Sequence, residues 1–192
     1  MQTFRFSLAV AVAAALLTFN TARAITVVPP SFDELVTEAE TIFQGTCTGS
    51  KSQWVGEGAQ RHIVTYVTFN VEDVLKGNPG ATYTLRMLGG TVDGTTMEVS
   101  DSPKFKPGNR DILFVEHNGE QFIPLVGIMH GRYRVERDQA SGEDVVLTNH
   151  GSAVSDVKDL GKGEHAAAPL AAKGLGPAEF KAAIKEKLGQ QR

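Results

Sequence analysis

The chain has 192 residues, with 19 Lys and Arg against 22 Asp and Glu, and a formal net charge of −3. This slight acidic excess argues against a nucleic-acid partner, which would require a clustered basic surface. The length fits one domain with enough residues to build a hydrophobic core.

Residues 1–24 have the pattern of a cleavable secretory signal peptide. A short basic n-region precedes residues 7–19, which are uncharged and mostly apolar. Ala22-Arg23-Ala24 then places small residues at the −3 and −1 positions of a cleavage site after Ala24. The apolar stretch is shorter than the roughly 20 residues that a membrane span needs. The sequence therefore predicts a periplasmic or secreted protein with no membrane span after cleavage.

The segment after the signal peptide predicts a short helix and then a series of strands. Ser31 and Glu34 form a capping-box pattern at the start of a helix over residues 31–40. The following segments alternate apolar and polar residues, as antiparallel strands do, and turn signals such as Asn118-Gly119 separate them. The expected strands are residues 41–54, 62–75, 82–88, 95–99, 111–117, 121–127, 131–135 and 144–147.

The rest of the chain predicts a linker and a second helix. Residues 151–176 are rich in Ala, Gly and Lys and indicate a flexible segment. Pro177 favours the first turn of a helix over residues 177–192 that packs on the domain. Residues 25–150 are accordingly expected to form a mostly-β domain, a small antiparallel barrel or sandwich with a helix near each end.

Cys47 is the only cysteine, so an intrachain disulfide is excluded. Its place in an apolar strand pattern predicts a small buried side chain, the alternatives being an intermolecular disulfide or a reactive thiol. Removing 24 of the 192 residues leaves 168, with 17 basic and 22 acidic side chains and a net charge of −5. Packing must then stabilise an exported domain that has no internal disulfide.

Two short motifs resemble catalytic sequences but lack the required context. Gly45-Thr46-Cys47-Thr48-Gly49 fits a nucleophile elbow, yet the residues that follow do not form the helix that this turn needs. Ser155-Asp156-Val157-Lys158 fits a Ser-x-x-Lys motif, yet it lies in the segment expected to be flexible. The sequence therefore predicts no catalytic residue, no cofactor and no enzyme.

The five histidines are spread singly along the chain, and no pair has the spacing of a local metal site. His62, His117 and His130 could still converge across a sheet. A metal-binding protein or small enzyme with a histidine site assembled across strands is therefore one alternative. A structural, envelope-associated module is another.

Several segments, taken in order, resemble a family of small exported bacterial proteins of uncharacterised function. More distantly, they resemble the OB-fold of netrin modules and tissue inhibitors of metalloproteinases. The segments are residues 32–36, 41–47, 65–77, 105–115 and 127–135, within a match over about residues 31–136.

The resemblance implies an OB-like β-barrel and a partner that is an exported protein, such as a secreted metalloprotease. Tissue inhibitors chelate the protease zinc through an N-terminal cysteine. Cleavage after Ala24 would leave Ile25 at the N-terminus, so that mechanism does not carry over. The leading hypothesis is an exported, non-enzymatic binding module.

Overall fold

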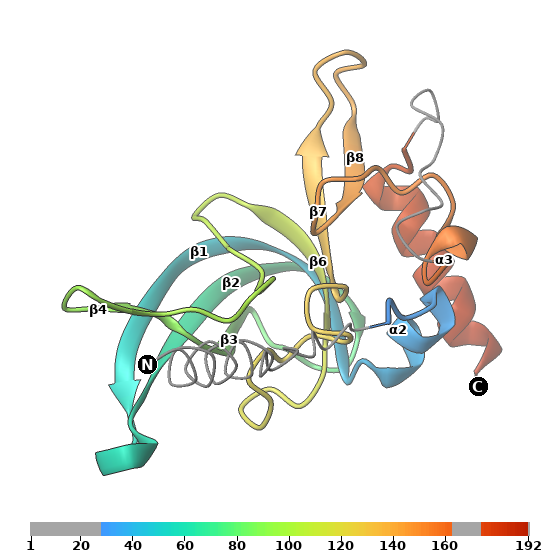
Figure 1. The fold of residues 1–192 in the computed structure, drawn as a ribbon. Coiled ribbons are helices and arrows are strands. Elements are labelled where there is room, and N and C mark those ends of the chain that lie inside the picture. Colours follow the sequence, from blue (N-terminus) through green and yellow to red (C-terminus); the bar gives the residue numbers. More distant parts are fainter. Residues whose placement is uncertain (1–27, 163–173, 192) are drawn as a thin grey trace, which may run out of the picture.

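The computed structural model describes residues 28–162 and 174–191 (Figure 1). The predicted signal peptide, residues 1–24, lies outside the described residues, and so do residues 163–173 of the segment expected to be flexible. The described chain is mostly β, with a six-stranded antiparallel sheet, a two-stranded sheet and an α-helix near each end. No helix in this part of the chain is long and apolar enough to cross a membrane.

The large sheet has the strand order β3-β2-β1-β6-β7-β8, and β4 pairs with β5. No strand pairing in the described residues joins β3 to β8. The helices are α2 (Phe32–Glu38) and α3 (Pro177–Gln190), with 3-10 turns η1 (Gly58–Gln60) and η2 (Val157–Asp159). The strands are β1 (Thr41–Val55), β2 (His62–Lys76), β3 (Thr82–Leu88), β4 (Gly90–Val92), β5 (Thr95–Met97), β6 (Arg110–Val115), β7 (Arg132–Arg137) and β8 (Asp144–Thr148). The expectation of a mostly-β chain with a helix near each end is confirmed.

The two longest strands, β1 and β2, form a curved ribbon (Figure 1). Their pairing shifts register at three places, the last between Cys47 and Gly49. Such bulges bend and twist a strand, which explains the curvature. Gly45 permits close approach of the two strands, because a Cβ added there would lie 2.7 Å from the Asn70 carbonyl oxygen.

The sheet buries apolar side chains on both faces, because alternate residues of its central strands point in opposite directions. On one face, α2 and α3 pack over the sheet, and Phe180 lies between Phe32 and Tyr133 with ring centroids 6.1 and 4.9 Å away. The other face curves around a second cluster that includes Phe43, Phe69, Leu85 and Leu113. Cys47 is buried in this second cluster, as predicted.

Both ends of α2 are held by side chains. The Glu34 amide donates to Ser31 Oγ at 3.3 Å, and the Ser31 amide donates to Glu34 Oε2 at 2.7 Å, so the predicted capping box is present. At the other end, Lys76 Nζ donates to the carbonyl oxygens of Val36 and Thr37 at 2.8 and 3.0 Å. The end of β2 therefore fixes the end of α2.

The strand predicted over residues 121–127 is wrong, and Asn118-Gly119 does not form a two-residue hairpin. The segment returns beside β6 only as an isolated bridge between Val115 and Leu125, with the Val126 amide donating to the Phe114 carbonyl at 3.0 Å and the Glu116 amide to the Pro124 carbonyl at 3.3 Å. The loop before this bridge contacts β3, because the Asn118 side chain accepts from the Arg86 amide at 3.0 Å and donates to the Thr84 carbonyl at 2.8 Å. These bonds hold the loop beside β3 before the chain returns to β6 at Leu125.

Candidate functional site

An open pocket of about 320 Å³ lies where β6 begins and the β7–β8 hairpin extends beyond it. Figure 1 shows this hairpin projecting away from the curved strands. The charged side chains of the lining are Arg110, Arg132, Arg134, Arg137, Asp111 and Glu136. We call this site the arginine pocket. Its four arginines outnumber its two carboxylates, but Arg110 pairs with Asp144 outside the lining, so Arg137 alone accounts for the remaining positive charge.

The pocket forms because β6 and β7 separate where β6 begins. The pairing of β6 with β7 stops at Arg110 and Val135. Before that point the Gly108 amide donates to the Cys47 carbonyl, and the Asn109 carbonyl accepts from the Cys47 amide, each at 2.8 Å. The chain before β6 is thus held against β1, while β7 continues beside β8.

A buried ion pair forms the floor of the arginine pocket. Arg132 Nε donates to Asp111 Oδ1 at 2.8 Å, and the two side chains are 5% and 0% exposed. The Arg132 guanidinium also donates to the Lys104 carbonyl at 2.9 Å and lies 4.4 Å from the centre of the Phe105 ring. Packing on both sides therefore holds Arg132 in one position.

The second oxygen of the Asp111 carboxyl is buried and has no hydrogen-bond partner in the described residues. Burial raises the pKa of Asp111, and the charge of Arg132 opposes this shift. A buried polar atom without a partner costs about 1–3 kcal/mol. A ligand that supplies a hydrogen-bond partner would remove this cost. When the Asp111 carboxyl is ionised, Oδ2 can accept from an N–H donor of the ligand. When the carboxyl is protonated, it can donate to an anion.

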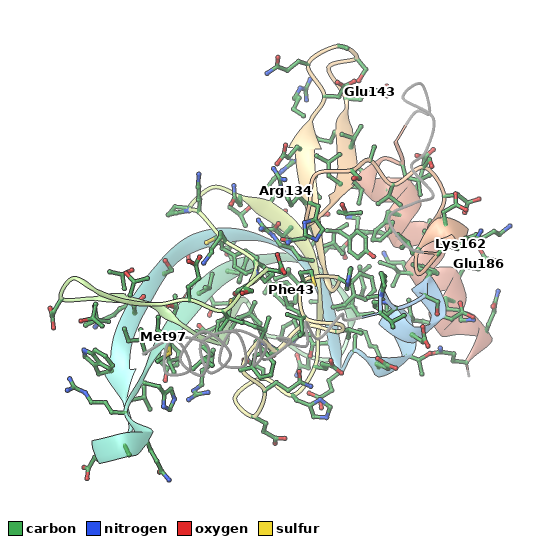
Figure 2. All side chains as sticks on the ribbon, viewed as in Figure 1. Phe43, Met97, Arg134, Glu143, Lys162 and Glu186 are labelled. Carbon is green, nitrogen blue, oxygen red and sulfur yellow. The ribbon has the colours of Figure 1, made fainter. Side chains whose placement is uncertain are left out.

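The other three arginines differ in how far their charge is already neutralised. Arg110 Nη2 lies 2.5 Å from Asp144 Oδ2, and Arg134 pairs with Glu136 on the same strand. Arg137 is exposed and makes no ion pair with another described residue. Figure 2 places Arg134 on β7 between the hairpin tip near Glu143 and the sheet interior near Phe43.

The chemistry of this lining is that of an anion-binding site. Guanidinium groups present paired N–H donors that match the oxygens of a carboxylate or phosphate. Among the described lining residues, the candidates for a base or nucleophile are the carboxylates of Asp111 and Glu136, each of which is bonded to an arginine. The arrangement supports recognition of an anionic group.

The histidines singled out from the sequence lie at separate turns. The His62 ring is 2.7 Å from the Gln60 carbonyl beside the β1–β2 turn, and the His117 ring is 3.0 Å from the Gln121 amide group. His130 lies in the turn between Gly127 and β7. Within residues 28–162 and 174–191, no three His, Cys, Asp or Glu side chains are grouped to hold a metal ion.

The arginine pocket was not predicted from the sequence, although the sequence holds a pattern that points to part of it. Arg132, Arg134 and Glu136 alternate with Tyr133 and Val135, which indicates one charged face on a strand. We find no protein-family model that matches the chain, and no curated protein that matches it significantly. The geometry of the pocket is therefore the basis for the function proposed below.

Proposed function

We propose that this chain is an exported, non-enzymatic binding module that binds a carboxylate group of a protein partner in the arginine pocket. The observation that carries this proposal is the composition of the lining, in which four arginines accompany two carboxylates and the exposed Arg137 makes no ion pair with another described residue. The floor of the pocket is fixed by the Asp111–Arg132 pair, and the Arg137 side chain, which lies on the other face of β7 and reaches toward Gly142, is the charge that a carboxylate would meet at the rim.

We further propose that the curved sheet is an OB-like barrel. The loop between β6 and β7 supports this, because it reaches both β3 and β6. The Leu88 amide of β3 donates to the Phe122 carbonyl at 2.6 Å, and Leu125 bridges to Val115 of β6. This loop would take the place of a strand and close the gap between the two.

The partner proposed is an exported protein, because the signal-peptide pattern directs this chain out of the cytoplasm. The sequence resemblance implies a secreted metalloprotease as one such partner. Such a partner would offer acidic side chains or a chain end to the arginine pocket.

The experiment is a calorimetric titration of the purified chain with acetyl-Ala-Glu-Ala-amide, compared with acetyl-Ala-Gln-Ala-amide. We expect saturable binding of the Glu peptide only, and its loss in Arg137→Gln. Arg61→Gln is the matched control, because Arg61 is also exposed but stacks on Trp54 beside the β1–β2 turn. Equal binding of both peptides, equal loss in both variants, or no binding at all contradicts the proposal.

A further inference from the structure

We infer that the outer edge of β1 pairs with an extended segment of a partner protein, with a small residue of that segment opposite Ser52 and an acidic residue opposite Lys51. This edge is separate from the arginine pocket, so the inference goes beyond the proposed function. The direction of the β1 backbone groups, the position of the β4–β5 hairpin and the charge of Lys51 support it.

The second half of β1 has a neighbouring strand on one side only. β1 pairs with β6 over residues 41–46, whereas its pairing with β2 continues to Val55. Cys47 is still occupied on the β6 side, because its amide and its carbonyl bond to residues 109 and 108. Beyond Cys47, no backbone group of the described residues bonds to β1 on the side away from β2. Figure 1 shows this part of β1 as the outer strand of the curved ribbon.

Alternate residues of this segment direct their backbone groups outward. The Gly89 amide donates to the Ile63 carbonyl at 2.8 Å, and the Val71 amide donates to the Ala81 carbonyl at 2.9 Å. The odd-numbered residues of β2 therefore face β3, and its even-numbered residues face β1. The register places these even-numbered residues opposite odd-numbered residues of β1 throughout residues 49–55. The residues that direct N–H and C=O away from β2 are therefore Ser50, Ser52 and Trp54.

These three residues present the groups that an extended polypeptide recognises. Each has an N–H and a C=O on the open side, and the groups repeat at every second residue, as they do in another strand. Addition of a strand to an open sheet edge is a general mode of peptide recognition, in which main-chain hydrogen bonds supply the affinity. We therefore expect the added segment to lie alongside residues 49–55.

The β4–β5 hairpin argues against a second copy of this chain as the partner. A Cβ added to Gly90 would lie 2.4 Å from Ser52 Oγ, so β4 begins directly against Ser52. From there the hairpin crosses β1 and projects beyond it, as the segment labelled β4 in Figure 1 shows. A twofold pairing of two β1 edges that uses all three outward residues is centred on Ser52. Both hairpins would then lie on the same face at the same place and collide.

The same hairpin limits the side chain that can lie opposite Ser52. Directly opposed residues of an antiparallel pair place their side chains on the same face of the sheet. The Ser52 hydroxyl lies on the hairpin side, 2.8 Å from Thr65 Oγ1, and Gly90 is close to both hydroxyls. A residue opposite Ser52 would lie under the projecting hairpin, so a small side chain such as Ala is required there.

The opposite face of this edge carries positive charge. Lys51 is exposed and makes no ion pair with another described residue. Tyr66 stands opposite Lys51 on β2, and Arg86 stands opposite Tyr66 on β3, so no carboxylate separates the two cations along this row. Opposite charges on directly opposed residues stabilise a pair of strands. An acidic residue opposite Lys51 is therefore favoured.

The test titrates the purified chain with acetyl-Val-Glu-Ala-Glu-Val-amide and follows the fluorescence of Trp54, the only tryptophan. We expect saturable binding. Methylation of the Ala nitrogen should abolish it, because that N–H points to Ser52, whereas methylation of the Glu nitrogens, which point away from β1, should leave it unchanged. Leu in place of Ala should weaken binding about tenfold through overpacking under the hairpin. Gln in place of both Glu should weaken it up to about fivefold.

Variants of the chain test the same edge from the other side. Ser50→Pro should abolish binding, because proline removes an outward N–H and no hydrogen bond to β2. Ser50→Ala is the matched control, since it removes the same hydroxyl and keeps that N–H. Lys51→Gln should weaken binding as much as the Gln peptide does. Arg137→Gln should leave binding unchanged, because the arginine pocket is a separate site.

The outcomes separate this inference from the proposed function. Binding that is lost in Arg137→Gln and kept in Ser50→Pro would place the peptide in the arginine pocket and overturn the inference. Equal affinity for the peptides methylated at Ala and at Glu would exclude strand pairing. A dimer of the chain alone that Ser50→Pro dissociates, measured by ultracentrifugation, would make a second copy the occupant. Absence of saturable binding also overturns the inference, while the binding of acetyl-Ala-Glu-Ala-amide tests the proposed function independently.

Discussion

Arg132 on β7 and Asp111 on β6 are joined by a hydrogen bond of 2.8 Å and are both buried. Asp111 lies next to Arg110 at the end of the shared ladder where the two strands separate, and Arg132 lies opposite Leu113 at the other end, so the bond runs diagonally across the ladder. It therefore anchors the part of the sheet from which the β7–β8 hairpin projects. Loss of this ion pair should therefore affect both the stability of the fold and the shape of the arginine pocket.

Arg132→Met should lower the free energy of unfolding by about 3–5 kcal/mol, because it leaves the Asp111 carboxyl buried without its ion-pair partner. Chemical denaturation measures this loss. Arg134→Met is the matched control on the same strand, and its half-exposed pair with Glu136 predicts a loss below about 1 kcal/mol. Equal losses in the two variants would show that the buried pair has no special role.

Asp111 should also give the stability a distinct pH dependence. Because burial raises its pKa above the ordinary 3.8, the folded protein keeps this proton where the unfolded chain has lost it. Its stabilising contribution is full below the ordinary pKa and is lost as the pH rises through the raised value. Relative to Asp111→Asn, which cannot titrate, the wild type should lose stability from about pH 4 upward.

Denaturation midpoints of both proteins across this range measure the effect. Hydrogen bonds from Ser31 and Ser141 lower the pKa values of Glu34 and Asp138. Both carboxyl groups titrate in both proteins, so their effects on stability cancel in the comparison. A wild type that gains stability relative to Asp111→Asn as the pH rises would reverse the predicted sign.

Cys47 should not react with thiol reagents while the protein is folded. Its side chain is 1% exposed, and burial raises the pKa of its thiol, so the reactive thiolate is scarce and shielded. A colorimetric thiol assay should detect Cys47 only in denaturant. Ser50→Cys, at an exposed position on the same strand, should react at once. Comparable rates for the two thiols would contradict the buried position of Cys47.

Lys76→Met should destabilise the protein by about 1–2 kcal/mol, because it removes a charged donor from the C-terminal carbonyls of α2. The free energy of unfolding is again the measurement. Lys51→Met is the matched control, since Lys51 is exposed and its loss should change stability by less than about 0.5 kcal/mol. If both variants unfold at the same denaturant concentration, β2 does not fix α2 through Lys76.

The sequence predicted those elements whose pattern is local. Alternating side chains located β1, β2 and β3 within one residue, and the Ser31–Glu34 spacing located the start of α2. The strand expected over residues 121–127 is reduced to a single bridge at Leu125, and Asn118 makes bonds to β3 that no local pattern encodes. The sequence therefore predicted single elements correctly, but not the course of the chain where it depends on contacts between distant strands.

The arginine pocket could be predicted only in part. The alternation of Arg132 and Arg134 indicates a charged strand face, but its surroundings depend on where β6 leaves β7. That departure is set by bonds between Cys47 and residues 108–109, more than 60 positions away in the chain. The pairing of Arg132 with Asp111 likewise spans the loop between two strands.

The most direct test of carboxylate binding in the arginine pocket is a heteronuclear NMR titration of the isotope-labelled chain with acetyl-Ala-Glu-Ala-amide. We predict saturable shifts of the backbone amides of Gly108, Asn109 and residues 134–137, with those around His62 and His117 unchanged. Shifts centred on another surface, or no saturable shifts, would contradict the assignment of this pocket as the binding site.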